Sequence, residues 1–502
     1  MATKKIIALL ITAALCTASL LACAKEDAGN QSTTAAEGDA AATTVSEDED
    51  VFEERIPDDL PAADYGGYEF RVVTKSEEHN VHWMARDIYA ETENGEPIND
   101  AVYYRNKAIE ERFNVKIVEK REKDPYSYAN KMIKSGIDDF DVFSGGLQDS
   151  TEKLAQEGML EDLRQMPGVN LSKPWWDQKA EEQMSIDNKL YMTTSDLVIM
   201  DEDATWVIMF NKKLIKDLSL DDPYALVNEG KWTMDKMLEM MKASAKDLNG
   251  DGNMNYEDQY GLVSQWSNAR YFFNGANEKA ARKDGSDMPV ITLYSDRSVN
   301  VVEKIIALQS DKSITINADD WTKDFPNDTV WDKMQLVIFN TDRSLFYYAG
   351  MNRVTLLRTM DTDFGILPPP KYDEQQEGYH VALSVWCSSC VSVPVTIEDK
   401  TRTGTILEAL TAESRYTVVP AYYEISLKGK FARDNESRDM LDLIFANRSY
   451  DIGEMYNWGA LNEITNNFSK SVQNTFTSDV EKNKSKIEAA MNKTIDKFIS
   501  LG

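Results

Sequence analysis

The sharpest chemical signal is a run of oxygen-bearing side chains between residues 247 and 258. They fall at positions 1, 3, 5, 9 and 12 of a twelve-residue loop, and Gly252 sits at position 6, where a calcium-binding loop turns sharply. Ca²⁺ prefers about six to eight oxygen ligands, and this spacing wraps them around one point. The loop predicts a single structural Ca²⁺ site, and the alternative is an acidic turn without metal. The predicted ligands are Asp247, Asn249, Asp251, Asn253 (through its backbone carbonyl), Asn255 and Asp258.

Motifs of common catalytic sites are missing. The sequence has no Gly-x-Ser-x-Gly, no His-Glu-x-x-His and no Gly-x-x-x-x-Gly-Lys-Ser/Thr run. A glycosidase needs only two carboxylates at the right separation, so the abundant acidic residues leave that class open. Cys387 and Cys390 spell Cys-x-x-Cys, but no helix signal of a redox motif accompanies them, which favours a local disulfide or two free thiols. We therefore expect a protein that is not an enzyme.

Aromatic residues point to carbohydrate binding. The chain holds ten Trp and 22 Tyr, and several of the Trp stand beside predicted loops next to Asp, Asn and Gln. Sugar rings present apolar C–H faces that stack on indole, while amide and carboxylate groups bind their hydroxyls. Any single Trp is still more often part of the core. Together these residues favour a cleft that binds a sugar.

Charge and cysteine content narrow the class further. Lys and Arg total 55 against 85 Asp and Glu, giving a net charge of −30. Such an acidic chain is poorly suited to nucleic acid, whose binding depends on basic residues, and to adsorption on anionic lipid. Four Cys in 502 residues do not make a disulfide scaffold, and three His argue against a His-rich zinc site.

The N-terminus has the form of an export signal. Lys4 and Lys5 precede an uncharged apolar run at 6–22, which predicts a signal peptide over residues 1–22. The run ends Leu20-Leu21-Ala22-Cys23, which resembles a bacterial lipobox and predicts a lipid anchor, such as palmitate, on Cys23. An ordinary signal peptide with a chance Cys is the alternative. Residues 23–64 are acidic and poor in large apolar side chains, which predicts a disordered tether.

The body begins with an α/β pattern. Strands are expected at 68–72, 115–118 and 140–143, with helices at 97–114 and 126–135 between them. This order opens a doubly wound sheet, whose ligands lie at the carboxyl ends of the strands, near residues 79–83 and 145–149. Further strands are expected at 188–191 and 206–210, helices at 232–246, 403–412 and from 479 onward, and a strand-like return segment at 383–395.

Several segments of the body resemble extracellular solute-binding lipoproteins of carbohydrate ABC transporters, of a clostridial type similar to family 1. The resemblance spans nearly all of 65–500. The segments that carry it begin at Asp64-Tyr-Gly-Gly-Tyr, Gly95-Glu-Pro-Ile-Asn, Glu110-Glu-Arg-Phe-Asn-Val, Tyr260-Gly-Leu, Leu407-Glu-Ala-Leu, Val419-Pro-Ala-Tyr-Tyr, Asp442-Leu-Ile-Phe and Tyr456-Asn-Trp-Gly.

The resemblance implies an α/β Venus flytrap of two lobes joined by hinge strands. Lobe 1 is expected at 65–198 with a return segment at about 386–415. Lobe 2 is expected at 199–385 with about 416–502. A monomer on the outer face of the cell membrane would bind its solute between the lobes and deliver it to an ABC permease. By position, the implied ligand contacts are His79, Trp83, Asp149, Trp206, Trp266, Tyr347, Trp386 and Trp458.

Two other functions stay open on the sequence. A surface-anchored glycan-degrading enzyme would need two facing carboxylates in the cleft. A non-catalytic glycan-binding adhesin would use its calcium loop to dock a partner.

Overall fold

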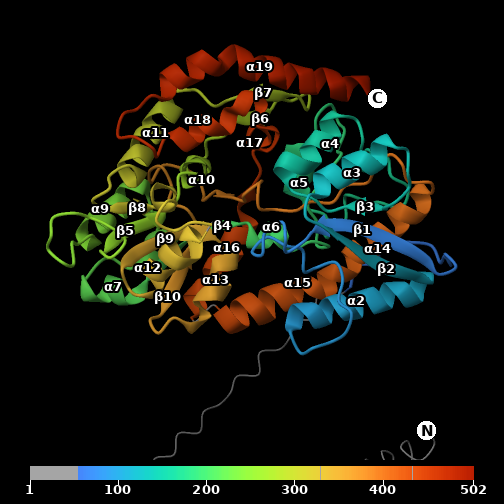
Figure 1. The fold of residues 1–502 in the computed structure, drawn as a ribbon, viewed down its shortest axis with the longest axis horizontal. Coiled ribbons are helices and arrows are strands. Elements are labelled where there is room, and N and C mark those ends of the chain that lie inside the picture. The colour runs from blue at the N-terminus through green and yellow to red at the C-terminus, as the bar shows by residue number, and fades with distance from the viewer. Residues whose placement is uncertain (1–54, 328, 432–433, 502) are drawn as a thin grey trace, which may run out of the picture. The chain divides into compact units, whose positions relative to one another are not determined.

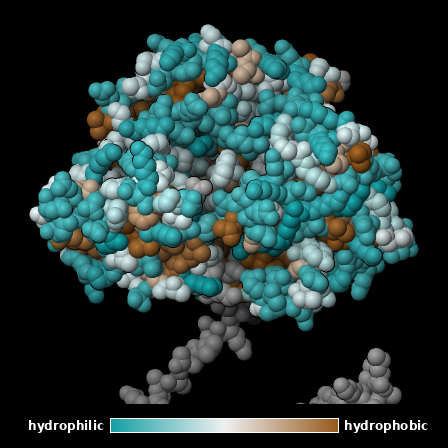
Figure 2. Space-filling view, viewed as in Figure 1, coloured by the Kyte–Doolittle hydropathy of each residue, from teal (hydrophilic) through white to brown (hydrophobic). Residues whose placement is uncertain are grey.

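The computed structural model describes residues 55–327, 329–431 and 434–501. The predicted signal peptide, Cys23 and most of the predicted tether lie outside these residues. Arg55–Gly502 forms one compact unit. Among the helices described, none is both long and apolar enough to cross a membrane. The face drawn in Figure 2 is mostly hydrophilic, with apolar side chains scattered singly or in small groups.

A three-stranded parallel sheet forms the first lobe, in the order β2-β1-β3. Its strands are β1 (Tyr68–Lys75), β2 (Val115–Glu122) and β3 (Val142–Phe143). The helix between β1 and β2, α2 (Pro97–Phe113), has proline in its first turn, and the Glu96 carboxylate accepts the Asn99 N–H at its start. The predicted strand–helix alternation of this lobe is confirmed (Figure 1).

A five-stranded sheet forms the second lobe, in the order β10-β4-β9-β5-β8. The strand β4 is antiparallel to both of its neighbours, whereas β5 is parallel to β8 and β9. The carboxyl ends of β5, β8, β9 and β10 therefore share one edge with the amino end of β4. Every residue of this sheet is buried, so helices and loops cover both faces (Figure 1). Its strands are β4 (Trp206–Asn211), β5 (Tyr260–Ser264), β8 (Thr315–Asn317), β9 (Ser344–Gly350) and β10 (Phe364–Leu367).

The remaining elements are two small strand pairs, the other helices and short 3₁₀ or π segments. Small strand pairs are β6 (Ala281–Lys283) with β7 (Pro289–Ile291), and β11 (Val381–Ala382) with β12 (Arg448–Ser449). The other helices are α3 (Pro125–Lys134), α4 (Glu152–Gln156), α5 (Gln178–Met184), α6 (Met200–Asp203), α7 (Lys212–Asp217), α8 (Pro223–Asn228), α9 (Met234–Ser244), α10 (Asn268–Gly275), α11 (Asp296–Gln309), α12 (Leu336–Asn340), α13 (Asn352–Leu356), α14 (Lys400–Tyr416), α15 (Val418–Pro420), α16 (Asn435–Ala446), α17 (Ile452–Tyr456), α18 (Leu461–Asn467) and α19 (Phe476–Ser500). Short 3₁₀ or π segments lie at Leu147–Thr151, Leu163–Gln165, Ala318–Trp321, Trp331–Gln335, Leu357–Thr359, Ala421–Phe431 and Trp458–Ala460.

Three stretches of chain connect the lobes. The first passes through α6 into β4. The second is the segment 383–395, which is predicted to be strand-like. A turn at residues 385–387 interrupts it, and it pairs only through single bridges, to Thr205, Gly146, Thr193, Phe143 and Leu160. The third is the C-terminal part, whose long helix α19 contacts both α4 and α11 (Figure 1).

Of two local predictions, a strand and a helix, the first is wrong and the second is confirmed. The strand predicted at 188–191 is wrong, because Asp187 and Asn188 both adopt positive φ (54° and 56°) and form a tight turn closed by one bridge between Ile186 and Lys189. The helix predicted at 232–246 is confirmed as α9, and its Met stripe is buried in the core.

Candidate functional site

The edges of the two sheets where a ligand is expected lie against each other. On the first lobe the edge is formed by the end of β1 at Lys75 and by the loop after it. On the second lobe it is formed by the start of β4 at Trp206 and the ends of β5 and β9. In α/β sheets, ligands bind outside the carboxyl ends of the strands. The segments at this edge therefore define the candidate site.

An aromatic row crosses from one lobe to the other. Trp83, in the loop after β1, stacks on Trp206 with ring centroids 6.2 Å apart and planes 16° apart. Trp206 in turn lies 4.7 Å from the Tyr271 ring of α10. Its indole Nε1 donates to Asn268 Oδ1 at 2.8 Å, which fixes the ring. Gly350 lets the row pack closely, since a Cβ there would lie 3.1 Å from the Trp83 ring.

Two basic side chains, Arg270 and Lys75, lie on segments of this edge, and Arg270 lies 5.7 Å from the Tyr271 ring. The Arg270 guanidinium lies 3.3 Å from Glu454 Oε1, and burial raises the pKa of Glu454 to about 7. The Lys75 ammonium donates to the Cys387 carbonyl oxygen at 2.7 Å, and burial lowers its pKa to about 8. The site therefore combines indole faces with strong hydrogen-bond donors, as polar ligands require.

An ion-pair chain also links the lobes. His82 Nε2 lies 2.9 Å from Asp332 Oδ2, and Arg353 NH1 lies 2.6 Å from Asp332 Oδ1. The hydrogen bond to His82 lowers the pKa of Asp332 to about 2. Asn462 Nδ2 of α18 also donates to Gln148 Oε1 at 3.1 Å. These contacts hold the two edges together.

Several buried polar atoms at this edge have no hydrogen-bond partner among the residues that the structure describes. An unpaired buried polar group costs about 1–3 kcal/mol, so a cluster of them at one edge is consistent with a site that receives a polar ligand. They are the hydroxyl oxygens of Ser76 and Tyr348, the side-chain oxygens of Asn317, Asn352 and Asn462, and Nε of Arg270.

Four of the sequence-predicted contacts lie on the segments of this edge. Trp83 and Trp206 are in direct contact. Trp266 follows β5; its backbone N–H donates to Asp319 Oδ2 at 2.7 Å, and Lys470 Nζ lies 4.8 Å from its ring. Trp386 lies on the return segment and keeps 47% of its surface exposed, so its indole is available for stacking.

The other four predicted contacts have partners elsewhere. His79 and Asp149 are exposed; His79 Nδ1 lies 3.0 Å from the Lys123 carbonyl oxygen, and Asp149 pairs with Lys153 at 3.1 Å. Tyr347 is buried in the core of the second lobe, with its hydroxyl 3.3 Å from Gln335 Oε1. Trp458 stacks on Tyr456 and donates to Thr494 Oγ1 at 2.9 Å. We do not place these four in the site.

Sequence reasoning missed the charged members of the site. Arg270 and Tyr271 lie in α10, directly after the end of β5, and a strand-to-helix junction of this kind could have pointed to them. Lys75 ends β1 and could have been found in the same way. Glu454 gives no local signal, because only the tertiary fold brings α17 to α10.

The predicted calcium loop is well ordered through its own hydrogen bonds. The two Asp247 oxygens accept the N–H groups of Gly250 and Gly252 at 2.6 and 2.8 Å. Asp258 is buried, and its oxygens accept the N–H groups of Leu248 and Asn255. Within the described residues, no three His, Cys, Asp or Glu side chains are grouped to hold a metal ion. The turn thus fits a calcium loop in its backbone, while its carboxylates are occupied by backbone donors.

Both described cysteines are free thiols. Cys387 and Cys390 are buried, and burial raises their pKa to about 11 and about 12. Of the two expectations for this pair, free thiols are therefore the one observed. Such thiols are poor nucleophiles at neutral pH.

Comparison with known proteins identifies the fold. No protein-family model and no curated protein sequence matches the chain. Among solved structures, the ABC substrate-binding protein Lmo0181 from Listeria monocytogenes, in complex with cycloalternan, aligns with a TM-score of 0.54 at 12% identity, over 85% of this chain and 99% of its own.

Two further structures align comparably. UspC of M. tuberculosis aligns with a TM-score of 0.54 at 11% identity, over 84% of this chain and 100% of its own. The GacH receptor of Streptomyces glaucescens, solved unliganded and with acarbose, aligns with a TM-score of 0.50 at 12% identity, over 87% and 98%. The chain therefore has the two-lobed α/β fold of solute-binding proteins.

Proposed function

We propose that this chain is a solute-binding protein that captures a sugar or oligosaccharide between its two lobes for an ABC importer. The observation that carries the proposal is the Trp83–Trp206 stack, which joins the lobes at the carboxyl edges of both sheets. The fold supports it, since similar structures were solved with cycloalternan and with acarbose. The buried polar atoms around the stack supply groups that would bind hydroxyls.

Binding and closure are coupled in this proposal. A ligand shifts an equilibrium only by its differential affinity for the two states. A saccharide that contacts residues of both lobes makes all of its contacts only when the lobes are closed around it. The closed form would be the one that the permease recognises.

A matched pair of variants tests the site. Trp206→Phe and Trp232→Phe each replace a buried indole of the second lobe, and each loses one hydrogen bond, to Asn268 Oδ1 at 2.8 Å and to the Pro368 carbonyl oxygen at 2.9 Å. We expect Trp206→Phe to weaken saccharide binding at least tenfold and Trp232→Phe to leave it unchanged, as measured by calorimetry after a fluorescence screen of neutral and acidic oligosaccharides.

Three results would count against the proposal. One is the absence of any saccharide that changes tryptophan fluorescence and compacts the protein in solution scattering. Another is an equal loss of affinity in both variants. The third is chromatographic detection of cleaved products from a bound glycan, which would favour the glycan-degrading alternative.

We also propose that the loop at 247–258 binds one structural Ca²⁺ ion. Asp247, Asn249, Asp251, Asn255 and Asp258 would provide side-chain oxygens and Asn253 its carbonyl, which makes a weak site suited to extracellular calcium. EGTA should then lower the melting temperature of the wild type by several degrees, and added Ca²⁺ should restore it. Asp251→Asn should show a smaller response. A melting temperature that EGTA leaves unchanged would remove the metal from the proposal.

The membrane anchor is a further part of the proposal. A lipid on Cys23 would hold the body at the outer face of the membrane next to the permease. Cys23→Ser should release the protein into the medium of cells that export it, whereas Cys387→Ser should leave it membrane-bound. Equal membrane retention of both variants would contradict the anchor.

A further inference from the structure

A cavity of about 220 Å³ lies where α5, β6 and the segment after β12 meet. The side chains that matter for its chemistry are Glu182, Gln183, Lys279, Arg282, Lys283 and Tyr450, all of which line it. The aromatic row of the candidate saccharide site contributes no residue to this lining. The cavity is therefore separate from that row.

The lining is basic, although the chain as a whole has a net charge of −30. Among the described residues that line the cavity, three are basic and Glu182 is the one acid. Glu182 is exposed to solvent, which screens its charge. Lys283 pairs with Asp287 and donates to Ser185 Oγ at 2.6 Å, so its charge is compensated. The positive charge left over is that of Lys279 and Arg282.

Lys279 is a buried cation with no carboxylate partner among the residues described. It is 8% exposed, and its Nζ donates to Gln183 Oε1 at 2.9 Å and to the Tyr450 carbonyl oxygen at 2.6 Å. Both acceptors are neutral, and an ammonium group has three N–H donors. Lysine is almost never fully buried unless it is paired. One N–H and the countercharge of this group are therefore open to a ligand.

Arg282 supplies a second cation without an acidic partner in the described part of the chain. Its side chain is exposed, and its Nη2 donates to the carbonyl oxygen of Asn277 at 2.6 Å and to Asn277 Oδ1 at 3.2 Å. These acceptors are neutral and hold the guanidinium in place. Its other N–H groups can donate to an oxyanion, to which charge-assisted hydrogen bonds are strong.

Asp451 does not remove the need for a countercharge. It attracts Lys279 electrostatically, but its two oxygens accept backbone N–H groups, from Ala280 at 2.6 Å and from Gly453 at 2.9 Å. These bonds hold the carboxylate at the start of α17. Asp451 therefore weakens the field of Lys279 without forming an ion pair with it.

The electrostatics around the cavity are consistent with an anionic ligand. Burial lowers the pKa of Lys279 to about 8 despite the attraction of Asp451. Burial and then the positive charges of Lys279 and Arg282 lower the pKa of His380 to about 4. A bound anion would favour the charged form of Lys279 and offset part of its burial cost.

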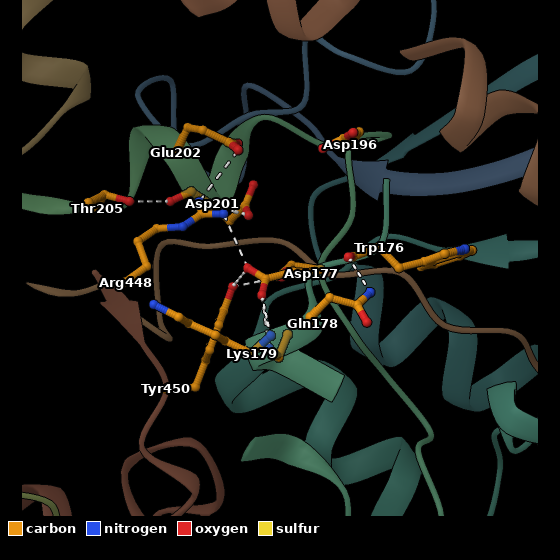
Figure 3. Close-up of polar contacts among 12 residues, drawn as sticks. Trp176, Asp177, Gln178, Lys179, Asp196, Asp201, Glu202, Thr205, Arg448 and Tyr450 are labelled. Atoms are coloured by element: carbon orange, nitrogen blue, oxygen red, sulfur yellow. Dashed lines mark hydrogen bonds and ion pairs between the residues drawn. The ribbon is translucent and has the colours of Figure 1, made fainter. Parts of the chain in front are cut away.

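We propose that this cavity binds one small oxyanion, a phosphate, sulfate or carboxylate group, through Lys279 and Arg282. The volume corresponds to roughly seven waters, at about 30 Å³ each in the liquid, which leaves room for such a group. Tyr450 gives the cavity a fixed wall, because its hydroxyl donates to Asp177 Oδ2 at 2.7 Å (Figure 3). Since Gln183 comes from α5 and Arg282 from β6, the ligand would also hold these two elements together.

The test uses the full chain and inorganic salts. Sodium phosphate and sodium sulfate are compared with sodium chloride at matched ionic strength, in buffers without calcium. We expect phosphate and sulfate to raise the melting temperature by a few degrees more than chloride does, and calorimetry to show one saturable phosphate site. An equal response to chloride would overturn the proposal, because general screening of charge needs no cavity.

Variants assign the binding to the cavity. Arg282→Gln changes an exposed side chain and should weaken phosphate binding about fivefold or more, and Lys279→Met should abolish it. Lys216→Gln removes one positive charge from an exposed position of α7, far from β6 (Figure 1), and should behave as wild type. Undiminished binding in Arg282→Gln would overturn the proposal even if Lys279→Met does not fold, and so would an equal loss in Lys216→Gln.

A further pair of probes identifies the source of the oxyanion. Displacement of phosphate by glucuronate but not by glucose would identify the carboxylate of an acidic sugar as a ligand, and displacement by neither would identify the free ion. Trp206→Phe keeps the test independent of the proposed saccharide site, because it should leave phosphate affinity unchanged. Loss of phosphate binding in Trp206→Phe would place the anion at the aromatic row and overturn the proposal.

Discussion

Trp206 and Trp458 are almost equally buried, yet they occupy different kinds of environment. Trp206 is 4% exposed and Trp458 is 2% exposed. Trp458 stacks on Tyr456 and donates to Thr494. Both of these partners belong to the C-terminal elements, which pack together. Trp206 instead stacks on Trp83, which comes from the other lobe. Burial alone therefore does not distinguish an indole packed between the lobes from an indole in the core of one region, whereas the position of its aromatic partner does.

The largest effect is expected where the indole belongs to the core. Trp458→Ala removes the stack on Tyr456 and leaves a cavity, which should reduce the free energy of unfolding by about 3–5 kcal/mol. Urea unfolding measures the loss, and calorimetry on the folded fraction should show unchanged saccharide affinity. Trp458→Phe keeps the ring and should lose much less stability. A loss below about 1 kcal/mol for the alanine variant would break the comparison.

Acidic groups show the same contrast between the inside of one lobe and the contact between the two lobes. Glu152 is buried inside the first lobe, and burial raises its pKa to about 7, whereas Asp332 between the lobes has a lowered pKa. Between about pH 4.5 and pH 7 the folded state holds a proton on Glu152 that the unfolded state has released, so this group makes stability fall as pH rises through that window. Its contribution is up to about 3 kcal/mol.

Glu152→Gln removes this titration. The wild type should lose stability between about pH 4.5 and pH 7, and the variant should show a flatter profile with a higher free energy of unfolding at pH 7.5. Glu161→Gln, in the same lobe, is the control and should keep the wild-type slope. Urea unfolding across the pH series decides the matter, and identical slopes for wild type and Glu152→Gln would show that the buried carboxyl does not titrate in this window.

A smaller effect on folding is expected at the interface. Trp83→Ala removes the stack on Trp206, which forms only when the lobes meet, and we expect a loss of about 1–2 kcal/mol in unfolding, below that of Trp458→Ala. Saccharide affinity should fall at least tenfold, because one face of the ligand loses its indole. A variant as unstable as Trp458→Ala with unchanged affinity would place Trp83 in the core.

The sequence predicts the lobes better than the site between them. Regular alternation at 68–72 and helical periodicity at 97–114 reflect local burial, and both elements are confirmed as β1 and α2. The resemblance to solute-binding proteins pointed to Trp83 and Trp206, which the structure brings together. Arg270 and Glu454 meet only through tertiary packing of α10 against α17, and no pattern along the chain encodes that contact. Asp187 and Asn188 show the converse, since a turn interrupts a run that reads as a strand.

The smallest effect is expected from the ion pair between His82 and Asp332, which joins the lobes at 2.9 Å. Asp332 is partly exposed and also binds Arg353 at 2.6 Å, so solvent screening should limit the His82 contribution to about 0.2–1 kcal/mol. The lowered pKa of Asp332, about 2, means that this carboxylate stabilises the fold above about pH 4, and that the contribution is lost as pH falls through about 2.

Because the pair forms only when the lobes meet, His82→Gln should weaken saccharide affinity about two- to fivefold at low salt and leave the free energy of unfolding nearly unchanged. The difference from wild type should shrink at high salt, where charges on the surface are screened. His79→Gln, in the same loop but bound to the Lys123 carbonyl oxygen within its own lobe, is the matched control and should match wild type at both salt concentrations. If His79→Gln and His82→Gln lower affinity equally, the loop as a whole sets closure and the contact with Asp332 does not.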